Sequence, residues 1–276
     1  AISWYEQHAG DLPDTAELRC AAAATLADVF RIDEAVTHLE RALAIEPDSA
    51  QVHSDYAAAL VERGEIDQAL MLLRRARELE PENPTHHSKL VYLLPFSDKV
   101  APDLILAEAR AFGERYAPSP KVPFQQANTR DPDRKLRVGY VSPDFRMHAA
   151  AAFLLPLFRH HDRDRVHVTC YSNVRRPDAV TAELRSLVDE WRDISPLDDE
   201  RAADLVQQDQ IDVLVDLAQH SAGNRLLLFA KKAAPVQVAW LGYPGTTGVP
   251  AMDYRLTDPG LDPPELGNGY GTETLV

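Results

Sequence analysis

An aspartate and a histidine four residues apart, Asp144 and His148, are the first candidates for chemistry in this sequence. They follow the apolar run 136–142, which is typical of a buried parallel strand and is ended by Pro143. Ligands of open α/β sheets bind outside the carboxyl ends of the strands, so both side chains are predicted at a ligand-binding edge. The alternative interpretation is a capping aspartate and a histidine that faces solvent.

Polar residues also follow two later apolar runs, 211–217 and 235–242. The residues after the first of these runs are Gln219, His220, Ser221 and Arg225. The second run leads into the turn LGYPGTTG at 241–248, whose glycines let backbone amides approach an anion. A helix beginning after this turn would add the positive end of its dipole. The turn is therefore a candidate phosphate site, expected at the same sheet edge as His148 and His220.

The pattern of residues 135–276 predicts the scaffold that holds these side chains. Apolar runs alternate with helical patterns of ten or so residues, which indicates right-handed βαβ units and a Rossmann-like parallel sheet. The predicted strands are 136–142, 166–172, 190–195, 211–217, 235–242 and 253–258. The predicted helices are 148–161, 178–189, 199–209 and 223–233.

The first third of the chain repeats with a period of 34 residues, marked by Pro13, Pro47 and Pro81. Small or apolar residues recur at matched places: Ala35, Leu39 and Ala42, then Ala69, Leu73 and Ala76. The pattern resembles the tetratricopeptide repeat, with Gly64 at the turn position and Phe30 at its counterpart. Such repeats stack into a superhelix with a concave binding face. A peptide-binding groove and a mere spacer are both open interpretations.

The repeat does not continue normally after Pro81. Adjacent histidines at a helix start, His86 and His87, are expected to cap the helix or face solvent, and an amphipathic helix is predicted at 102–116. Four prolines without apolar periodicity mark residues 117–134 as a linker. The predicted organisation (α + α/β) is a repeat domain at 1–116, the linker at 117–134 and a Rossmann-like domain at 135–276.

Composition excludes several classes of partner. A formal net charge of -14 disfavours nucleic acid and anionic membrane surfaces. Two cysteines in separate apolar segments, and no apolar run of about 18 residues, favour a soluble cytoplasmic protein.

No dinucleotide fingerprint, P-loop or zinc-ligand spacing occurs. The aspartate pairs Asp131 and Asp133, and Asp162 and Asp164, do not follow apolar strands. We therefore expect neither a metal nor a cofactor.

The combination resembles the O-GlcNAc transferase family, in particular its bacterial members, over nearly the whole chain. The resemblance rests on VGYVSPDFRMH at 138–148, on PVQVAWLGYPGTTG at 235–248 and on the preceding repeats. It implies an inverting, metal-independent transferase that moves N-acetylglucosamine from UDP-GlcNAc to Ser or Thr hydroxyls of polypeptides. It also implies a GT-B fold, with this chain carrying the repeats and the amino-terminal Rossmann half.

The resemblance implies roles for individual residues. His148 is the first candidate for the general base beside Asp144, and His86 and His87 are candidates for the same role. The choice between these histidines stays open. Other positions that match the family near the donor or substrate are His220, Ser221, Arg225, Leu241, Gly242, Tyr243, Pro244, Gly245 and Thr246. The resemblance supplies no derivable role for Arg225.

Three features depart from the family pattern. Gln219 stands where bacterial members usually carry glycine, and alanines occupy 149–152 in place of partly polar residues. The sequence ends at Val276, before the second Rossmann half that would supply most of the UDP pocket and a leaving-group lysine. We expect an acceptor-side half that is active only with a donor half, which a separate chain supplies or which has been lost from this one. The alternatives are a non-catalytic, repeat-based peptide-binding scaffold and a phosphate-binding α/β receiver.

Overall fold

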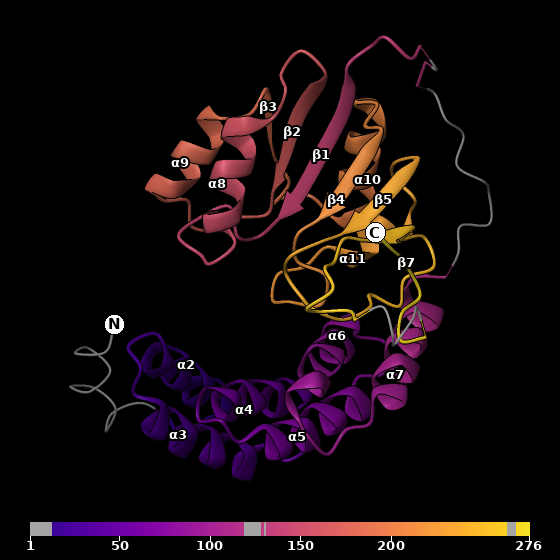
Figure 1. Ribbon diagram of the computed structural model, residues 1–276. Helices are drawn as coiled ribbons and strands as arrows, with labels where there is room; N and C mark the ends of the chain where they lie inside the picture. Colours follow the sequence, from indigo (N-terminus) through magenta and orange to yellow (C-terminus); the bar gives the residue numbers. More distant parts are fainter. Residues whose placement is uncertain (1–12, 119–127, 130, 264–268) are drawn as a thin grey trace. The chain divides into compact units, whose positions relative to one another are not determined.

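The structure is a computed structural model that describes residues 13–118, 128–129, 131–263 and 269–276 (Figure 1). The chain divides into two compact units, Ala1–Val100 and Ala101–Val276. The predicted linker at 117–134 lies largely outside the described residues. None of the described helices is both long and apolar enough to cross a bilayer.

The first unit is an array of paired helices. Its elements are α2 (Ala16–Ala27), α3 (Ile32–Ile45), α4 (Ala50–Glu62), α5 (Ile66–Leu79), α6 (Pro84–Leu93) and the short 3-10 helix η1 (Leu94–Phe96). Thr15, Ser49 and Asn83 each cap the first helix of a repeat by accepting a backbone N–H. The alanines at the matched repeat positions are fully buried, so the paired helices approach closely. The predicted tetratricopeptide array is confirmed.

The turn inside each repeat takes the same backbone conformation with different residues. Gly64 has φ +80°, and Phe30, its counterpart one repeat earlier, has φ +62°. Glycine adopts this left-handed conformation without a steric penalty, whereas a side chain raises its energy by roughly 1 kcal/mol. The Phe30 ring is exposed, so no packing offsets that cost.

The second unit begins with α7 (Pro102–Tyr116) and continues into one parallel sheet. Its strands are β1 (Leu136–Ser142), β2 (Val166–Ser172), β3 (Glu190–Asp193), β4 (Val213–Asp216), β5 (Val236–Ala239), β6 (Tyr254–Arg255) and β7 (Thr274–Leu275). Their order is β3-β2-β1-β4-β5-β6-β7, the doubly wound arrangement that the alternating pattern predicted. No sequence pattern predicts β7, and α7, predicted as part of the repeat domain, groups with the sheet.

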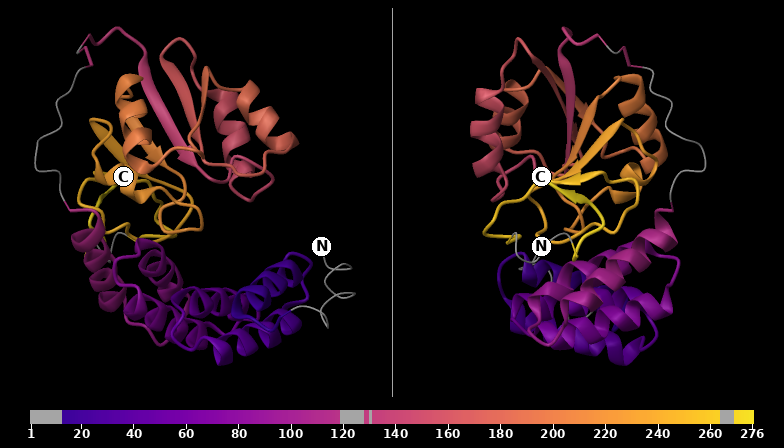
Figure 2. Two further views of the ribbon diagram at one scale, coloured as in Figure 1. Left: turned by 180° about the vertical axis from the view of Figure 1, so that it is seen from behind. Right: turned by 45° about the vertical axis from the view of Figure 1, so that its right-hand side comes forward.

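Helices cover both faces of the sheet. They are α8 (Ala151–His160), α9 (Ala179–Ser186), α10 (Asp199–Gln208) and α11 (Leu226–Ala230). Figure 2 shows α8 and α9 on one face and α10 on the other, and α11 contacts α10. Phe145, Leu154, Phe158 and Leu184 fill the core beneath α8 and α9. This layering leaves the loops at the carboxyl ends of the strands to form the candidate site.

Candidate functional site

The order of the strands reverses between β1 and β4, because β2 and β3 lie on one side of β1 and the later strands on the other. In doubly wound sheets ligands bind at such a switch point. Asp144 lies two residues beyond β1 and is buried, and its backbone N–H donates to the Ser142 hydroxyl over 2.9 Å. Nε2 of His148 lies 3.9 Å from Oδ1 of Asp144. The structure thus brings the predicted pair together at the switch point.

His148 is oriented by its own loop. Its side chain is 41% exposed, and Nδ1 accepts the Ala150 N–H over 3.3 Å. A neutral ring that accepts at Nδ1 carries its proton on Nε2, the nitrogen that faces Asp144. Asp178 anchors the same loop, since Oδ2 accepts the Met147 N–H over 2.7 Å while Oδ1 caps α9. The bond from Met147 is the main cause that lowers the pKa of Asp178.

Asp216, the last residue of β4, is fully buried. Its Oδ1 accepts backbone N–H groups of Ala218 and Gln219 over 2.9 and 3.1 Å. Oδ2 has no hydrogen-bond partner among the described residues. Burial raises the pKa of Asp216 to about 6, and the two backbone bonds oppose that rise only in part.

His220 is held inside the second unit. It is 1% exposed, and Nε2 lies 2.9 Å from the carbonyl oxygen of Thr247. A carbonyl only accepts, so Nε2 carries the proton. The ring makes T-shaped contacts with the rings of Phe112 in α7 and of Tyr243, at centroid distances of 4.9 and 5.7 Å. This packing joins α7 to the loops after β4 and β5.

Arg225 has a structural role that the sequence did not reveal. Its guanidinium donates to Asp199 Oδ1 over 2.6 Å and to Asn173 Oδ1 over 3.2 Å. It also donates to the carbonyl oxygens of Ile194 and Leu197 over 3.0 and 2.9 Å. Arg225 therefore ties together the loops after β2 and β3 and the start of α10.

The glycines of the turn after β5 serve close packing of the chain on itself. A Cβ on Gly242 would overlap the Leu217 carbonyl oxygen, and one on Gly245 would lie 2.5 Å from the Tyr243 ring. A Cβ on Gly248 would overlap the Ala109 carbonyl oxygen of α7. Residues 241–253 form no helix, so the dipole considered for this turn is not present.

A buried carboxylate, Glu273, holds this turn from the other side. It accepts the Thr246 hydroxyl over 2.6 Å, the Thr247 N–H over 2.7 Å, and the Thr247 hydroxyl. Glu273 is not predicted from the sequence, because the threonines that it holds lie more than 25 residues earlier in the chain. The adjacent hydroxyls of Thr246 and Thr247 indicate that an acceptor is needed, but no local pattern identifies it.

The remaining predicted residues are placed as follows. Pro244 accepts from Arg255 through its carbonyl oxygen over 3.0 Å, and Leu241 has φ +78°. His86 and His87 belong to α6 of the first unit and are both buried, so the expectation that they face solvent is wrong. Nε2 of His86 lies 3.1 Å from Oε2 of Glu80.

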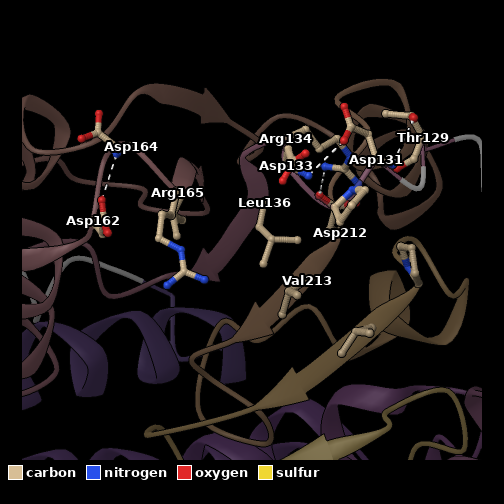
Figure 3. A pocket seen from close by; sticks show the side chains of 14 residues that line it. Thr129, Asp131, Asp133, Arg134, Leu136, Asp162, Asp164, Arg165, Asp212 and Val213 are labelled. Carbon is tan, nitrogen blue, oxygen red and sulfur yellow. Dashed lines mark hydrogen bonds and ion pairs between the residues drawn. The ribbon is translucent and has the colours of Figure 1, made fainter.

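A cavity of about 750 Å³ lies at the opposite border of the sheet, where β1, β2, β4 and β5 begin (Figure 3). The aspartates of both Asp-x-Asp pairs line it: Asp131, Asp133, Asp162 and Asp164. Arg134 in its wall is paired with Asp212 over 2.6 Å. Within the described ranges no three His, Cys, Asp or Glu side chains are grouped so as to hold a metal ion. No histidine is among the described residues that line this cavity, so it has no counterpart of His148.

Comparison with known proteins identifies the family. The family model described as "Glycosyl transferase family 41" matches residues 73–275, and a tetratricopeptide-repeat model matches residues 26–91. The chain belongs to glycosyltransferase family 41. The family-41 match spans α6, α7 and the whole described sheet, and therefore contains both the β1 and β4 loops.

Solved and curated relatives agree with this assignment. The structure titled "Thermobaculum terrenum O-GlcNAc transferase mutant - K341M" superposes with a TM-score of 0.89 and 39% identity, over 97% of this chain and 51% of that one. The Arabidopsis thaliana "Probable UDP-N-acetylglucosamine--peptide N-acetylglucosaminyltransferase SPINDLY" is 44% identical over 50% of this chain and 16% of its own. The Caenorhabditis elegans "UDP-N-acetylglucosamine--peptide N-acetylglucosaminyltransferase" is 37% identical over 52% and 12%. The chain thus spans about half of the solved structure and less of these curated relatives.

Proposed function

We propose that this chain is the acceptor-side half of an enzyme that transfers N-acetylglucosamine from UDP-GlcNAc to Ser or Thr hydroxyls of polypeptides, with inversion and without a metal. The observation that carries this proposal is the pair Asp144 and His148 at the switch point. The names of the solved and curated relatives support the substrate class.

In this reaction His148 acts as the general base. The acceptor hydroxyl displaces the weak bond from Ala150 and gives its proton to Nδ1, while Nε2–H closes on Asp144, which stabilises the imidazolium. The acceptor oxygen forms a bond to C1 of the sugar, and the bond from C1 to the phosphate oxygen breaks. UDP leaves with the electron pair, so the configuration at C1 inverts.

The donor lies along the loops after β4 and β5 in this proposal. His220, Ser221 and the residues Leu241–Thr246 remain the proposed donor and substrate contacts. Glu273 and α7 fix the second of these loops, which is the rigidity that a preorganised binding loop needs. Because the donors of Arg225 are engaged within the chain, this residue contributes by positioning the neighbouring loops.

Two free cysteines support the proposed cytoplasmic location. Cys20 is half-buried and Cys170 is buried, and neither forms a disulfide. Burial raises the pKa of the Cys20 thiol to about 11 and also raises that of Cys170, which keeps both in the unreactive thiol form. Free thiols persist in reducing compartments.

A transfer assay tests the function. The chain, alone and fused to the remaining half of the Thermobaculum terrenum protein, is mixed with UDP-GlcNAc and a Ser/Thr peptide, and peptide mass is followed by mass spectrometry. We expect transfer by the fusion and its loss, by at least 100-fold, in His148→Ala. If transfer is lost in His86→Ala or His87→Ala but kept in His148→Ala, the general base is one of the two histidines of α6. A peptide that binds without transfer in every form indicates the scaffold alternative.

A further inference from the structure

The surface beside His148, the candidate general base, is apolar. In the segment 147–155, MHAAAAFLL, His148 is the only polar side chain. Met147 is 73% exposed, and Ala149, Ala152 and Phe153 are exposed as well. Exposed apolar side chains that gather at one place mark a surface that binds another molecule. The apolar residues that follow each other around the base therefore call for an occupant.

The backbone of this segment is fixed. The Met147 N–H donates to Oδ2 of Asp178 over 2.7 Å. The carbonyl oxygens of residues 148–150 accept the N–H groups of residues 151–153 over 3.0 to 3.1 Å, which is the three-residue spacing of a tight turn. Met147 and His148 are consecutive, so their Cα atoms are about 3.8 Å apart. The exposed methionine is thus held next to the base.

The position of the base indicates what covers Met147. An acceptor hydroxyl has to come within hydrogen-bond distance of Nδ1 of His148, about 3 Å. In an extended polypeptide the neighbouring residues follow at about 3.3 Å per residue, so they lie over the residues that flank His148. A donor half that covered Met147 would take the space that these neighbouring residues need.

The charged groups near the base do not favour a charged occupant. Arg146 donates to Oδ1 of Asp144 over 3.1 Å, so its charge is paired within the chain. Asp178 accepts the N–H groups of Met147 and Thr181. Residues 149–155 carry no charge. An apolar side chain of the acceptor is therefore the occupant that this surface fits.

We propose that Met147 binds an apolar side chain of the acceptor polypeptide, one or two residues from the Ser or Thr that is modified. This inference rests on the proposed function and deepens it, because it adds a specificity-determining residue to the acceptor side. The methionine side chain is unbranched and flexible, so it adapts to apolar groups of different shapes. Met147 thus selects apolar character at this position of the acceptor, not one residue type.

The test uses Met147→Gln with a matched control, Met71→Gln, both made in the fusion described above. Glutamine keeps roughly the length of methionine but ends in a polar carboxamide. Met71 of α5 is also an exposed methionine, at 62%, and it belongs to the first unit, outside the candidate site. Both side chains are exposed, so both variants should keep the melting temperature of the wild type.

Transfer is measured as kcat/KM on a panel of peptides. Each peptide carries one Ser flanked by alanines, and one alanine within three residues of the Ser is replaced by leucine. At one position within two residues of the Ser we expect leucine to raise kcat/KM about fivefold for the wild type and for Met71→Gln. Met147→Gln should lack this gain but transfer to the alanine-flanked peptide at the wild-type rate. Such a double-mutant cycle assigns the contact to Met147.

Several results would overturn the inference. One is a panel in which leucine raises kcat/KM at no position for the wild type, and another is a leucine gain that Met147→Gln keeps. An equal loss of kcat/KM on the alanine-flanked peptide would instead assign Met147 to the positioning of His148. A lower melting temperature of the Met147→Gln fusion, with the leucine gain kept, would place Met147 between the two halves.

The panel also separates this inference from the proposed function. A wild-type fusion that transfers to no peptide removes both. Transfer by the wild type with no preference for leucine removes the inference alone.

Discussion

The loops after β1 and β4 carry the same two residue types at the same spacing, Asp144 with His148 and Asp216 with His220. The two strands are parallel neighbours, and Asp216 is in register with Val141. Asp144 instead lies two residues beyond the last residue of β1, Ser142. Asp216 is therefore inside the strand ladder, and Asp144 is at the rim.

This offset separates a solvent-accessible pair from a structural one. At the rim, His148 keeps an exposed ring within 3.9 Å of a carboxylate oxygen. Inside, His220 donates to the Thr247 carbonyl and is enclosed by Phe112 and Tyr243. An Asp-x-x-x-His spacing after a strand is thus not sufficient evidence for catalysis, since the position of the aspartate relative to the neighbouring strand decides exposure.

The largest effect should come from His220→Ala. Removing the ring leaves a cavity beside Phe112 and breaks the bond to Thr247, so we expect the free energy of unfolding to fall by about 4 kcal/mol. Urea denaturation followed by circular dichroism measures the change. A loss below about 1 kcal/mol would contradict the structural role assigned to His220.

Asp216→Asn tests the buried carboxyl by its pH dependence. Because the folded pKa, about 6, lies above the ordinary value of 3.8, the folded wild type loses stability as pH rises from about 4 to 6, by about 3 kcal/mol. Below pH 4 both states are protonated and the group contributes nothing. Asparagine cannot ionise, so the variant should gain about 3 kcal/mol relative to wild type between pH 4 and pH 7. Parallel curves for the two proteins across this range would refute the raised pKa.

Glu273→Gln tests the contacts that hold Thr247, whose carbonyl oxygen accepts from His220. The amide keeps the size of the side chain but exchanges charge-assisted hydrogen bonds to Thr246 and Thr247 for weaker neutral ones. We therefore expect the free energy of unfolding to fall by about 2 kcal/mol. Hydrogen exchange at the Thr247 amide should accelerate, while the Ala150 amide beside His148 stays unchanged. Equal acceleration at both amides would mean that the two loops are coupled.

The smallest stability effect is expected for His148→Ala. The ring is 41% exposed and its bond to the Ala150 N–H is long, so the free energy of unfolding should change by less than about 0.5 kcal/mol. The same urea titration used for His220→Ala provides the direct comparison. A loss as large as that of His220→Ala would remove the distinction between the two loops.

Local sequence patterns determined most of the secondary structure of this protein. The 34-residue period carries its own caps at Thr15, Ser49 and Asn83, and the apolar runs 136–142 and 166–172 coincide with β1 and β2. Such features follow from side chains within a few residues of one another, which is why the sequence alone predicted the repeat array, the parallel sheet and the meeting of Asp144 with His148.

Only the tertiary structure shows which polar residues are buried and have a structural role. Glu273 reaches Thr246 and Thr247, Phe112 covers His220, and the Gly248 turn packs on α7, all across separations that no local pattern encodes. Burial of a polar group depends on what the distant chain places over it. Spacing therefore located the candidate residues, but only packing separated exposed His148 from enclosed His220.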